Sequence, residues 1–203
     1  MVKPAFSEQP SLDGFDAPAR PQDRLFFALY PAPEVAARAD ALRRALQARH
    51  GLSGKPVHQD RLHVTLNHVG DFAGLPQGLL ADARQAAEAL APLQQAFDIG
   101  FDRVSSFRGR ADSQPMILLG EQGVGAVTAF QARLDLALRT AGVIRRREPF
   151  TPHMTLSYEP RQLPPEPVEP IAWEAHEFVL VHSLIGQGRH EVLARWPLPA
   201  RVA

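Results

Sequence analysis

The sequence predicts an α+β fold built from two similar lobes around a central groove. Three observations predict it. Short apolar segments typical of strands alternate with amphipathic segments typical of helices, the order of these segments repeats once along the chain, and a His-x-Thr sequence recurs at the same place in each repeat. A duplicated lobe arranged about a pseudo-twofold axis would place the two recurring sequences opposite each other across a groove.

The expected strands are short segments that are apolar or alternating and are bounded by charges or turn residues. Residues 24–30 form an apolar run, and residues 61–69 alternate before they reach Gly70. The proline-rich residues 163–170 are predicted to be an extended surface loop. Further strands are expected at 97–102, 116–119, 153–158, 178–185 and 191–196.

Three segments have helical composition. Residues 33–50 are rich in Ala, Arg and Leu, with apolar residues at three- and four-residue spacings, and Gly51 ends this helix. Residues 79–90 form the second helix, and residues 124–141 the third. The order is therefore β-α-β-α-β followed by β-α-β-β-β, with a His-x-Thr strand after the first helix of each half.

Length and composition limit the classes of protein to which the chain can belong. Its 203 residues suit one compact domain, expected over residues 24–203 with lobes that do not separate, behind a flexible tail at 1–23. The absence of cysteine excludes disulfides, thiolate metal sites and a cysteine nucleophile, and it favours a cytoplasmic protein. No stretch approaches the ~18 apolar residues of a membrane span, so we expect no membrane association.

The charge balance also bears on partners. Lys plus Arg and Asp plus Glu number 22 each. This balance removes bulk electrostatic attraction as a reason to bind long nucleic acid, so any contact with RNA should be local.

The two His-x-Thr sequences carry the side chains best suited to chemistry. On a strand His63 and Thr65 share one face, as do His153 and Thr155, while the intervening apolar residues pack on the other face. An imidazole and a hydroxyl two residues apart span ~6.5 to 7 Å, a separation that lets both reach one phosphate. Two imidazoles can act as acid and base and two hydroxyls can hold phosphate oxygens, the groups that metal-independent cleavage of a phosphodiester requires.

One His-x-Thr sequence alone would be an ordinary feature of a half-buried strand. Two copies, both ending in Thr-Leu and both on the corresponding strand of each half, favour a functional pair.

Around these motifs the sequence resembles the two-histidine (2H) phosphoesterases, specifically the bacterial RNA 2',3'-cyclic phosphodiesterases, also called 2'-5' RNA ligases. Residues 24–29 resemble the opening strand of that family, 61–70 its first signature and 149–156 its second. Residues 180–183 and 193–198 resemble its closing hairpin.

The resemblance implies a fold and a function. The fold is a pair of lobes, each a small antiparallel sheet with helices on the outside. His63 and His153 would be the catalytic acid and base, and Thr65 and Thr155 would bind the phosphate. The implied reaction opens RNA 2',3'-cyclic phosphate ends to 2'-phosphomonoesters without metal or cofactor, with joining of 2'-5' RNA ends as a related activity.

The chain departs from the family at two places. Residues 67–69 replace an aromatic and a leucine that many members carry, and Tyr158 stands where some members have arginine. A cationic contact with phosphate could come from the basic run at 145–147, for which a solvated helix end or loop is the competing interpretation. The further candidates for substrate contact are Arg147, Tyr158, His182, Ser183 and Phe107.

Each remaining candidate also has a structural interpretation. His182 could be a satisfied strand histidine, and Phe107 could pack in the ordinary way instead of stacking on a base. His58, His63 and His68 recur every five residues, but alternation along a continuous strand would separate them, so no metal site is expected. The remaining histidines are expected at the surface: His50, His176 and His190.

Two other functions remain open from the sequence. The same site could cleave another small cyclic or 2'-5' linked nucleotide, since nothing in the motifs reads a base. The chain could instead be a non-catalytic module that binds RNA ends, although two intact histidines argue against it. In each case the partner is an RNA end or a small nucleotide, and a monomer is expected.

Overall fold

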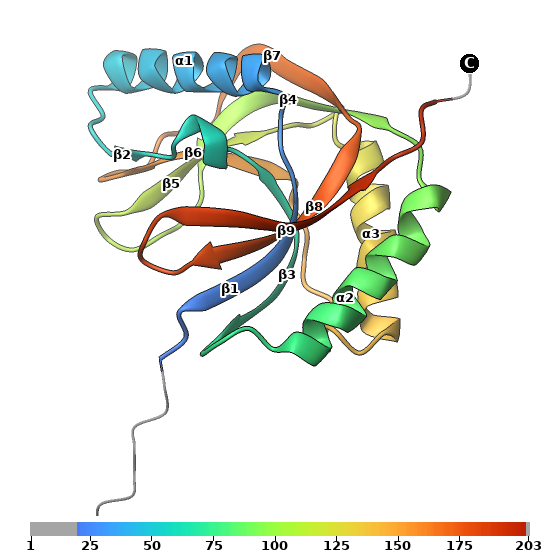
Figure 1. Cartoon of the computed structure of the whole chain (residues 1–203). Helices are drawn as coiled ribbons and strands as arrows, with labels where there is room; N and C mark the ends of the chain where they lie inside the picture. The colour runs from blue at the N-terminus through green and yellow to red at the C-terminus, as the bar shows by residue number, and fades with distance from the viewer. Residues whose placement is uncertain (1–19, 202–203) are drawn as a thin grey trace, which may run out of the picture.

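The computed structural model describes residues 20–201 (Figure 1). Most of the predicted tail, residues 1–19, lies outside the described residues. The sheet begins before the predicted boundary at residue 24, because the Gln22 N–H donates to the Phe72 carbonyl and the first strand starts at Asp23. His182 and the Gly74 N–H both bond the Asp23 carboxylate. These long-range contacts have no signal in the local sequence.

Helices and strands alternate along the chain as the sequence predicts. The elements are β1 (Asp23–Leu29), α1 (Pro33–His50), β2 (Lys55–Pro56), η1 (Gln59–Arg61), β3 (Val64–Phe72), α2 (Gln77–Leu90), η2 (Ala91–Leu93), β4 (Phe97–Ser106), β5 (Gln114–Leu119), α3 (Gly125–Thr140), β6 (His153–Glu159), β7 (Glu166–Ala175), β8 (Glu177–Leu184) and β9 (Arg189–Pro197).

The described strands form one nine-stranded sheet in the order β7-β4-β5-β6-β3-β1-β8-β9, with β2 added beside β6. Every pairing among them is antiparallel. This confirms the predicted α+β class. The order is symmetric about its middle, where β6 and β3 meet, so two sets of four strands form two lobes.

The lobes do not coincide with the two halves of the sequence. Strand β4 from the first half lies beside β5 from the second, and β8 from the second half lies beside β1 from the first. The last strands of each half of the sequence therefore lie in the lobe that contains the first strands of the other half. This exchange ties the two lobes into one body.

The proline-rich segment corrects one prediction. Residues 163–170 were expected to be a surface loop, but Glu166–Ala175 is strand β7, paired with β4. Proline lacks the N–H that a central strand must donate, but it is tolerated at the edge of a sheet, where β7 lies. A proline-rich sequence predicts an extended backbone both for an edge strand and for a surface loop, so it does not show whether the segment pairs with a strand.

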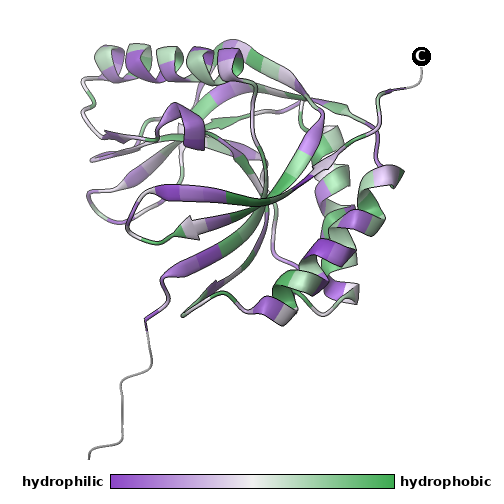
Figure 2. Cartoon of the chain, viewed as in Figure 1, coloured by the Kyte–Doolittle hydropathy of each residue, from purple (hydrophilic) through white to green (hydrophobic). Residues whose placement is uncertain are grey.

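The helices cover the apolar side of the strands. Helix α1 packs on β6 and β7, while α3 packs on α2, β3 and β4 (Figure 1). Green and purple segments alternate along the helices and strands in Figure 2, as expected when one side of each is buried. The residues that follow each histidine and threonine of the motifs are buried in this core, as predicted: Val64, Leu66, Met154 and Leu156.

None of the helices in residues 20–201 combines the length and apolar character needed to cross a membrane.

Candidate active site

The two His-x-Thr strands meet at the centre of the sheet. Strands β3 and β6 share a single pair, Val64 with Met154, the middle residues of the two motifs. Extending this antiparallel register by one residue in each direction places His63 beside Thr155 and Thr65 beside His153. The four side chains therefore share one face, with each imidazole next to the hydroxyl of the other motif.

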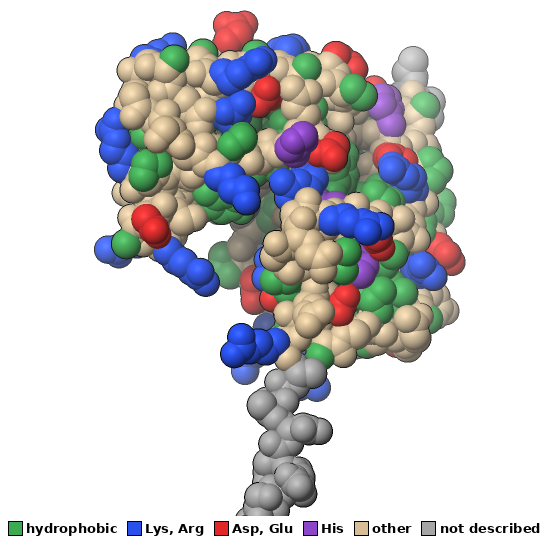
Figure 3. Space-filling view, turned by 60° about the vertical axis from the view of Figure 1, so that its left-hand side comes forward, with side chains coloured by type: hydrophobic (Ala, Val, Ile, Leu, Met, Phe, Trp, Pro, Cys, Tyr) green, Lys and Arg blue, Asp and Glu red, His purple; other side chains and the backbone are tan. Residues whose placement is uncertain are grey.

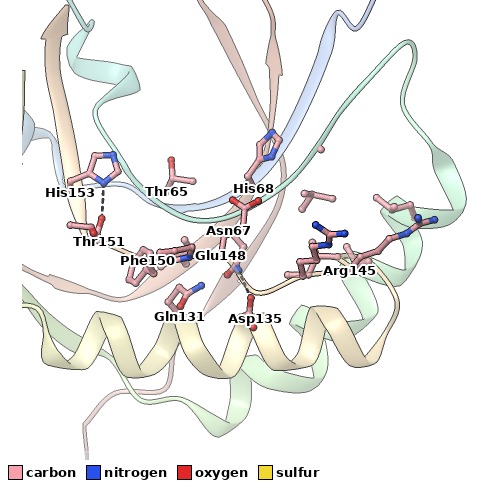
Figure 4. Close-up of a pocket in the computed structure, with 18 of the residues that line it drawn as sticks. Thr65, Asn67, His68, Gln131, Asp135, Arg145, Glu148, Phe150, Thr151 and His153 are labelled. Carbon is pink, nitrogen blue, oxygen red and sulfur yellow. Dashed lines mark hydrogen bonds between the residues drawn. The ribbon is translucent and has the colours of Figure 1, made fainter. Parts of the chain in front are cut away.

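A matching backbone hydrogen bond orients each imidazole. Nδ1 of His63 lies 2.6 Å from the Arg61 carbonyl oxygen. Nδ1 of His153 lies 2.7 Å from the Thr151 carbonyl oxygen, the bond drawn in Figure 4. Since a carbonyl oxygen can only accept, Nδ1 of each ring must carry the proton. Each Nε2 is then left to accept a proton when the ring is neutral or to donate one when it is charged, the property that a general base or acid requires.

Aromatic rings hold the two imidazoles in place. His63 stacks on Phe26 with ring centroids 5.1 Å apart, and it meets His190 edge to face with ring centroids 5.3 Å apart. The Tyr30 hydroxyl in turn bonds Nδ1 of His190 at 2.9 Å. On the other side of the groove, His153 meets Phe107 edge to face at 4.8 Å.

These surroundings favour neutral imidazoles. The pKa of His63 is lowered to about 4, mainly by burial and also by positive charge on His190, His153 and Arg61, against the opposing effect of the bond to the Arg61 carbonyl. Burial also lowers the pKa of His153 and of His190. The free protein at neutral pH thus presents unprotonated Nε2 atoms to the groove.

Two equivalent bulges shape the strands beyond the motifs. In the pairing of β3 with β1 the register skips Leu66, and in the pairing of β6 with β5 it skips Leu156. One extra residue reverses the alternation of faces. Asn67 and Ser157 consequently turn into the core, while the next residues, His68 and Tyr158, turn outward into the groove.

The central groove has a volume of about 440 Å³. A neighbouring hollow of about 580 Å³ shares Thr65, His68 and His153 with it, and Figure 4 shows these three along one edge. A third hollow of about 830 Å³ continues from the opposite end. The polar and aromatic residues that line the central groove are Arg24, Phe26, Arg61, His63, Thr65, His68, His153, Thr155, Tyr158, Ser183 and His190.

Of the candidates for substrate contact, the structure brings three to the site. Tyr158 and Ser183 line the central groove, and Phe107 packs on His153. His182 does not line it: its ring is buried, Nε2 lies 2.7 Å from the Asp23 carboxylate, and Nδ1 has no hydrogen-bond partner among the described residues, although the Glu191 carboxylate lies 3.5 Å away. Arg147 lines none of the three hollows, although its neighbours Arg145 and Arg146 line the one beside His153.

Several residues that line the groove were not predicted from the sequence, and two of them lie beside His63. His190, expected at the surface, contacts His63, and the hairpin register pairs it with Ser183. That pairing is the signal that could have found it, since Ser183 was already a candidate. Arg61 lines the groove two residues before His63, and its guanidinium forms no ion pair with any carboxylate in the part of the chain that the structure describes.

The prediction that alternation separates His63 from His68 was wrong. The bulge at Leu66 puts both rings on the groove face. His68 is held there by the Asp71 carboxylate at 3.0 Å, and Arg24 binds the same carboxylate through two hydrogen bonds of 2.7 Å. Among residues 20–201, no three His, Asp or Glu side chains converge in a way that could hold a metal ion.

The comparison with family models decides the family. Residues 11–184 match the model of the 2'-5' RNA ligase superfamily. The chain belongs to this superfamily. Its members are phosphoesterases and ligases that act on RNA or nucleotide substrates. No curated protein matches the chain.

Solved structures agree with this assignment. LigT of E. coli in its apo form is 26% identical, with a TM-score of 0.65, and the match covers 89% of this chain and 99% of LigT. LigT in complex with 3'-AMP is 26% identical, with a TM-score of 0.63 and coverage of 88% and 99%. A Thermus thermophilus protein, TT0787, shares the fold at 24% identity and a TM-score of 0.70, over 88% of this chain and 100% of that one.

Proposed function

We propose that this superfamily member hydrolyses 2',3'-cyclic phosphate ends of RNA to 2'-phosphomonoesters, with His63 and His153 as the acid and base. The observation that carries the proposal is the pair of imidazoles with matching tautomers, interleaved with two hydroxyls around one groove. The occurrence of 3'-AMP in the LigT complex supports a nucleotide as the ligand of such a groove.

The reaction uses each of the four side chains once. The neutral Nε2 of one histidine accepts a proton from water as its oxygen attacks phosphorus. The P–O3' bond breaks, and the second histidine donates its Nε2 proton to the departing O3'. Thr65 and Thr155 donate hydrogen bonds to the non-bridging oxygens, where negative charge builds up in the transition state. With a 5'-hydroxyl in place of water, the same steps join two RNA ends through a 2'-5' linkage.

The environments of the two histidines suggest which one accepts a proton and which one donates it. His63 has its pKa lowered to about 4 by burial and by its cationic neighbours, which favours it as the proton acceptor. In His153 burial is the cause of the lowered pKa, and a bound phosphate anion would oppose that effect, so His153 is the better proton donor.

A product assay tests the proposal. Purified protein is incubated with each of the four nucleoside 2',3'-cyclic phosphates and with an oligoribonucleotide that ends in one, and the products are separated by chromatography. We expect 2'-phosphates and no 3'-phosphates. Binding without turnover on every substrate would instead favour the non-catalytic RNA-end module.

A further inference from the structure

Tyr158 occupies a position at which an aromatic ring is available to a ligand. The bulge at Leu156 turns it onto the groove face, and its relative exposure is 45%. It is the equivalent of His68 in the other motif strand, five residues beyond its histidine. The two differ in what surrounds them, because His68 bonds Asp71 while Tyr158 is paired across β2 with Lys55.

The hollow beyond Tyr158 adjoins the central groove. It has a volume of about 830 Å³, and it shares Val57, Arg61 and Tyr158 with the groove, together with Gly186 and Gly188 of the hairpin between β8 and β9. Figure 3 shows a hollow on this side of the molecule with Lys and Arg side chains around its rim. These shared residues place the hollow directly beside the groove that contains the two histidines.

The charge of this hollow suits a phosphate backbone. Its basic side chains are Lys55, Arg61 and Arg110, and its one acidic side chain is Asp112. None of the three basic groups forms an ion pair within residues 20–201, whereas Arg24, which lines the central groove, is paired with Asp71. In a chain whose basic and acidic residues balance at 22 each, three unpaired cations around one hollow are a local concentration of positive charge.

Distance separates this hollow from the reacting phosphate. The bulge at Leu156 takes up one residue, so Tyr158 lies two ladder positions beyond Thr155, a span of about 7 Å along the strand. That span suits the nucleotide next to the reacting end rather than the cyclic phosphate itself.

We propose that the hollow formed by Tyr158, Lys55 and Arg110 is a subsite for the neighbouring nucleotide of a single-stranded oligoribonucleotide. Tyr158 stacks on the unpaired base, and Lys55 and Arg110 neutralise the adjoining phosphate, while Arg61 lies between the two sites. An exposed ring beside a basic groove is how proteins hold single strands without reading their sequence. The proposal rests on the proposed function and adds to it a second binding site, which would make the enzyme prefer an oligoribonucleotide to a free cyclic mononucleotide.

The test compares kcat/KM for an oligoribonucleotide ending in a 2',3'-cyclic phosphate with kcat/KM for the cyclic mononucleotide of the same base. The native protein should prefer the oligonucleotide by about tenfold or more, the size of one stacking interaction. Tyr158→Ala should lower this ratio toward one, and Tyr158→Phe, which keeps the ring, should preserve it. Arg44→Glu on the outer face of α1 is the control for change of charge and should leave the ratio unaltered.

The salt dependence of KM tests the contribution of Lys55 and Arg110 separately from that of the Tyr158 ring. The Lys55→Glu and Arg110→Glu double variant should make the oligonucleotide KM less dependent on salt, by about 0.7 in the log–log slope for the one phosphate that the two cations neutralise. Equal kcat/KM for the two substrates in the native protein would overturn the subsite and leave the proposed function standing. An unchanged ratio in Tyr158→Ala would overturn it as well. Failure of the native protein to turn over either substrate would count against the proposed function itself.

Discussion

The lowered pKa of His63 should make the stability of the fold depend on pH. A histidine has an ordinary pKa of 6.5, and in the fold that of His63 is about 4. Between these pH values the unfolded chain binds a proton that the folded chain does not bind, so the free energy of unfolding falls as the pH falls from 6.5 toward 4. A difference of roughly 2.5 pKa units corresponds to at most ~3 kcal/mol, and we expect about 1 to 3 kcal/mol because the ring borders an open groove.

Urea unfolding at pH 7.5, 6.5, 5.5 and 4.5 measures this effect. Carboxylates with lowered pKa, such as Asp71, also destabilise the fold in acid, so the readout is the difference between the native protein and His63→Gln. The variant should lose less stability between pH 6.5 and 4.5 than the native protein does. His58→Gln, at a side chain that is 82% exposed, should follow the native protein. Parallel curves for His63→Gln and the native protein would refute the reasoning.

Three further predictions follow from the site. Turnover of a 2',3'-cyclic phosphate should survive dialysis against EDTA and gain little from Mg²⁺ or Mn²⁺, whereas loss on chelation and recovery with one metal would contradict metal-independent catalysis. The pH profile of kcat/KM should be bell-shaped, with limbs that belong to the histidine pair, and a flat profile from pH 5 to 9 with chemistry rate-limiting would contradict paired acid and base. Thr65→Ala or Thr155→Ala should weaken binding of the 2'-phosphate product by about tenfold in calorimetry, as for the loss of one hydrogen bond to a charged group, and unchanged affinity in both would remove the threonines from the phosphate site.

The sequence predicts the centre of the site because its residues follow the alternation of a regular strand. His63, Thr65 and their counterparts come before the bulges, so faces assigned by counting agree with the fold. Beyond the bulges, counting residues along the strand assigns side chains to the wrong face. It would place Tyr158 in the core with Met154, and it separates His68 from His63.

Pairing between segments that are far apart in the chain sets the other limit on what the sequence predicts. Strand β7 exists because the edge of β4 accepts its backbone, and no local pattern distinguishes such a strand from an extended loop. His190 reaches His63 only because the hairpin of β8 and β9 folds back beside β1. The periodicity of a sequence identifies the buried and exposed faces of one helix or strand. Which other element packs on each face depends on residues elsewhere in the chain.

The most direct test of the account is the turnover of a 2',3'-cyclic phosphate by His63→Ala and His153→Ala. Each should lose about 10² to 10⁴-fold in kcat, the contribution typical of one proton-transfer group. Because acid and base act in one displacement, the double variant should be little worse than the worse single variant. Near-native kcat in both single variants, with circular dichroism and urea midpoints showing an intact fold, would contradict the assignment of the paired histidines as the catalytic groups.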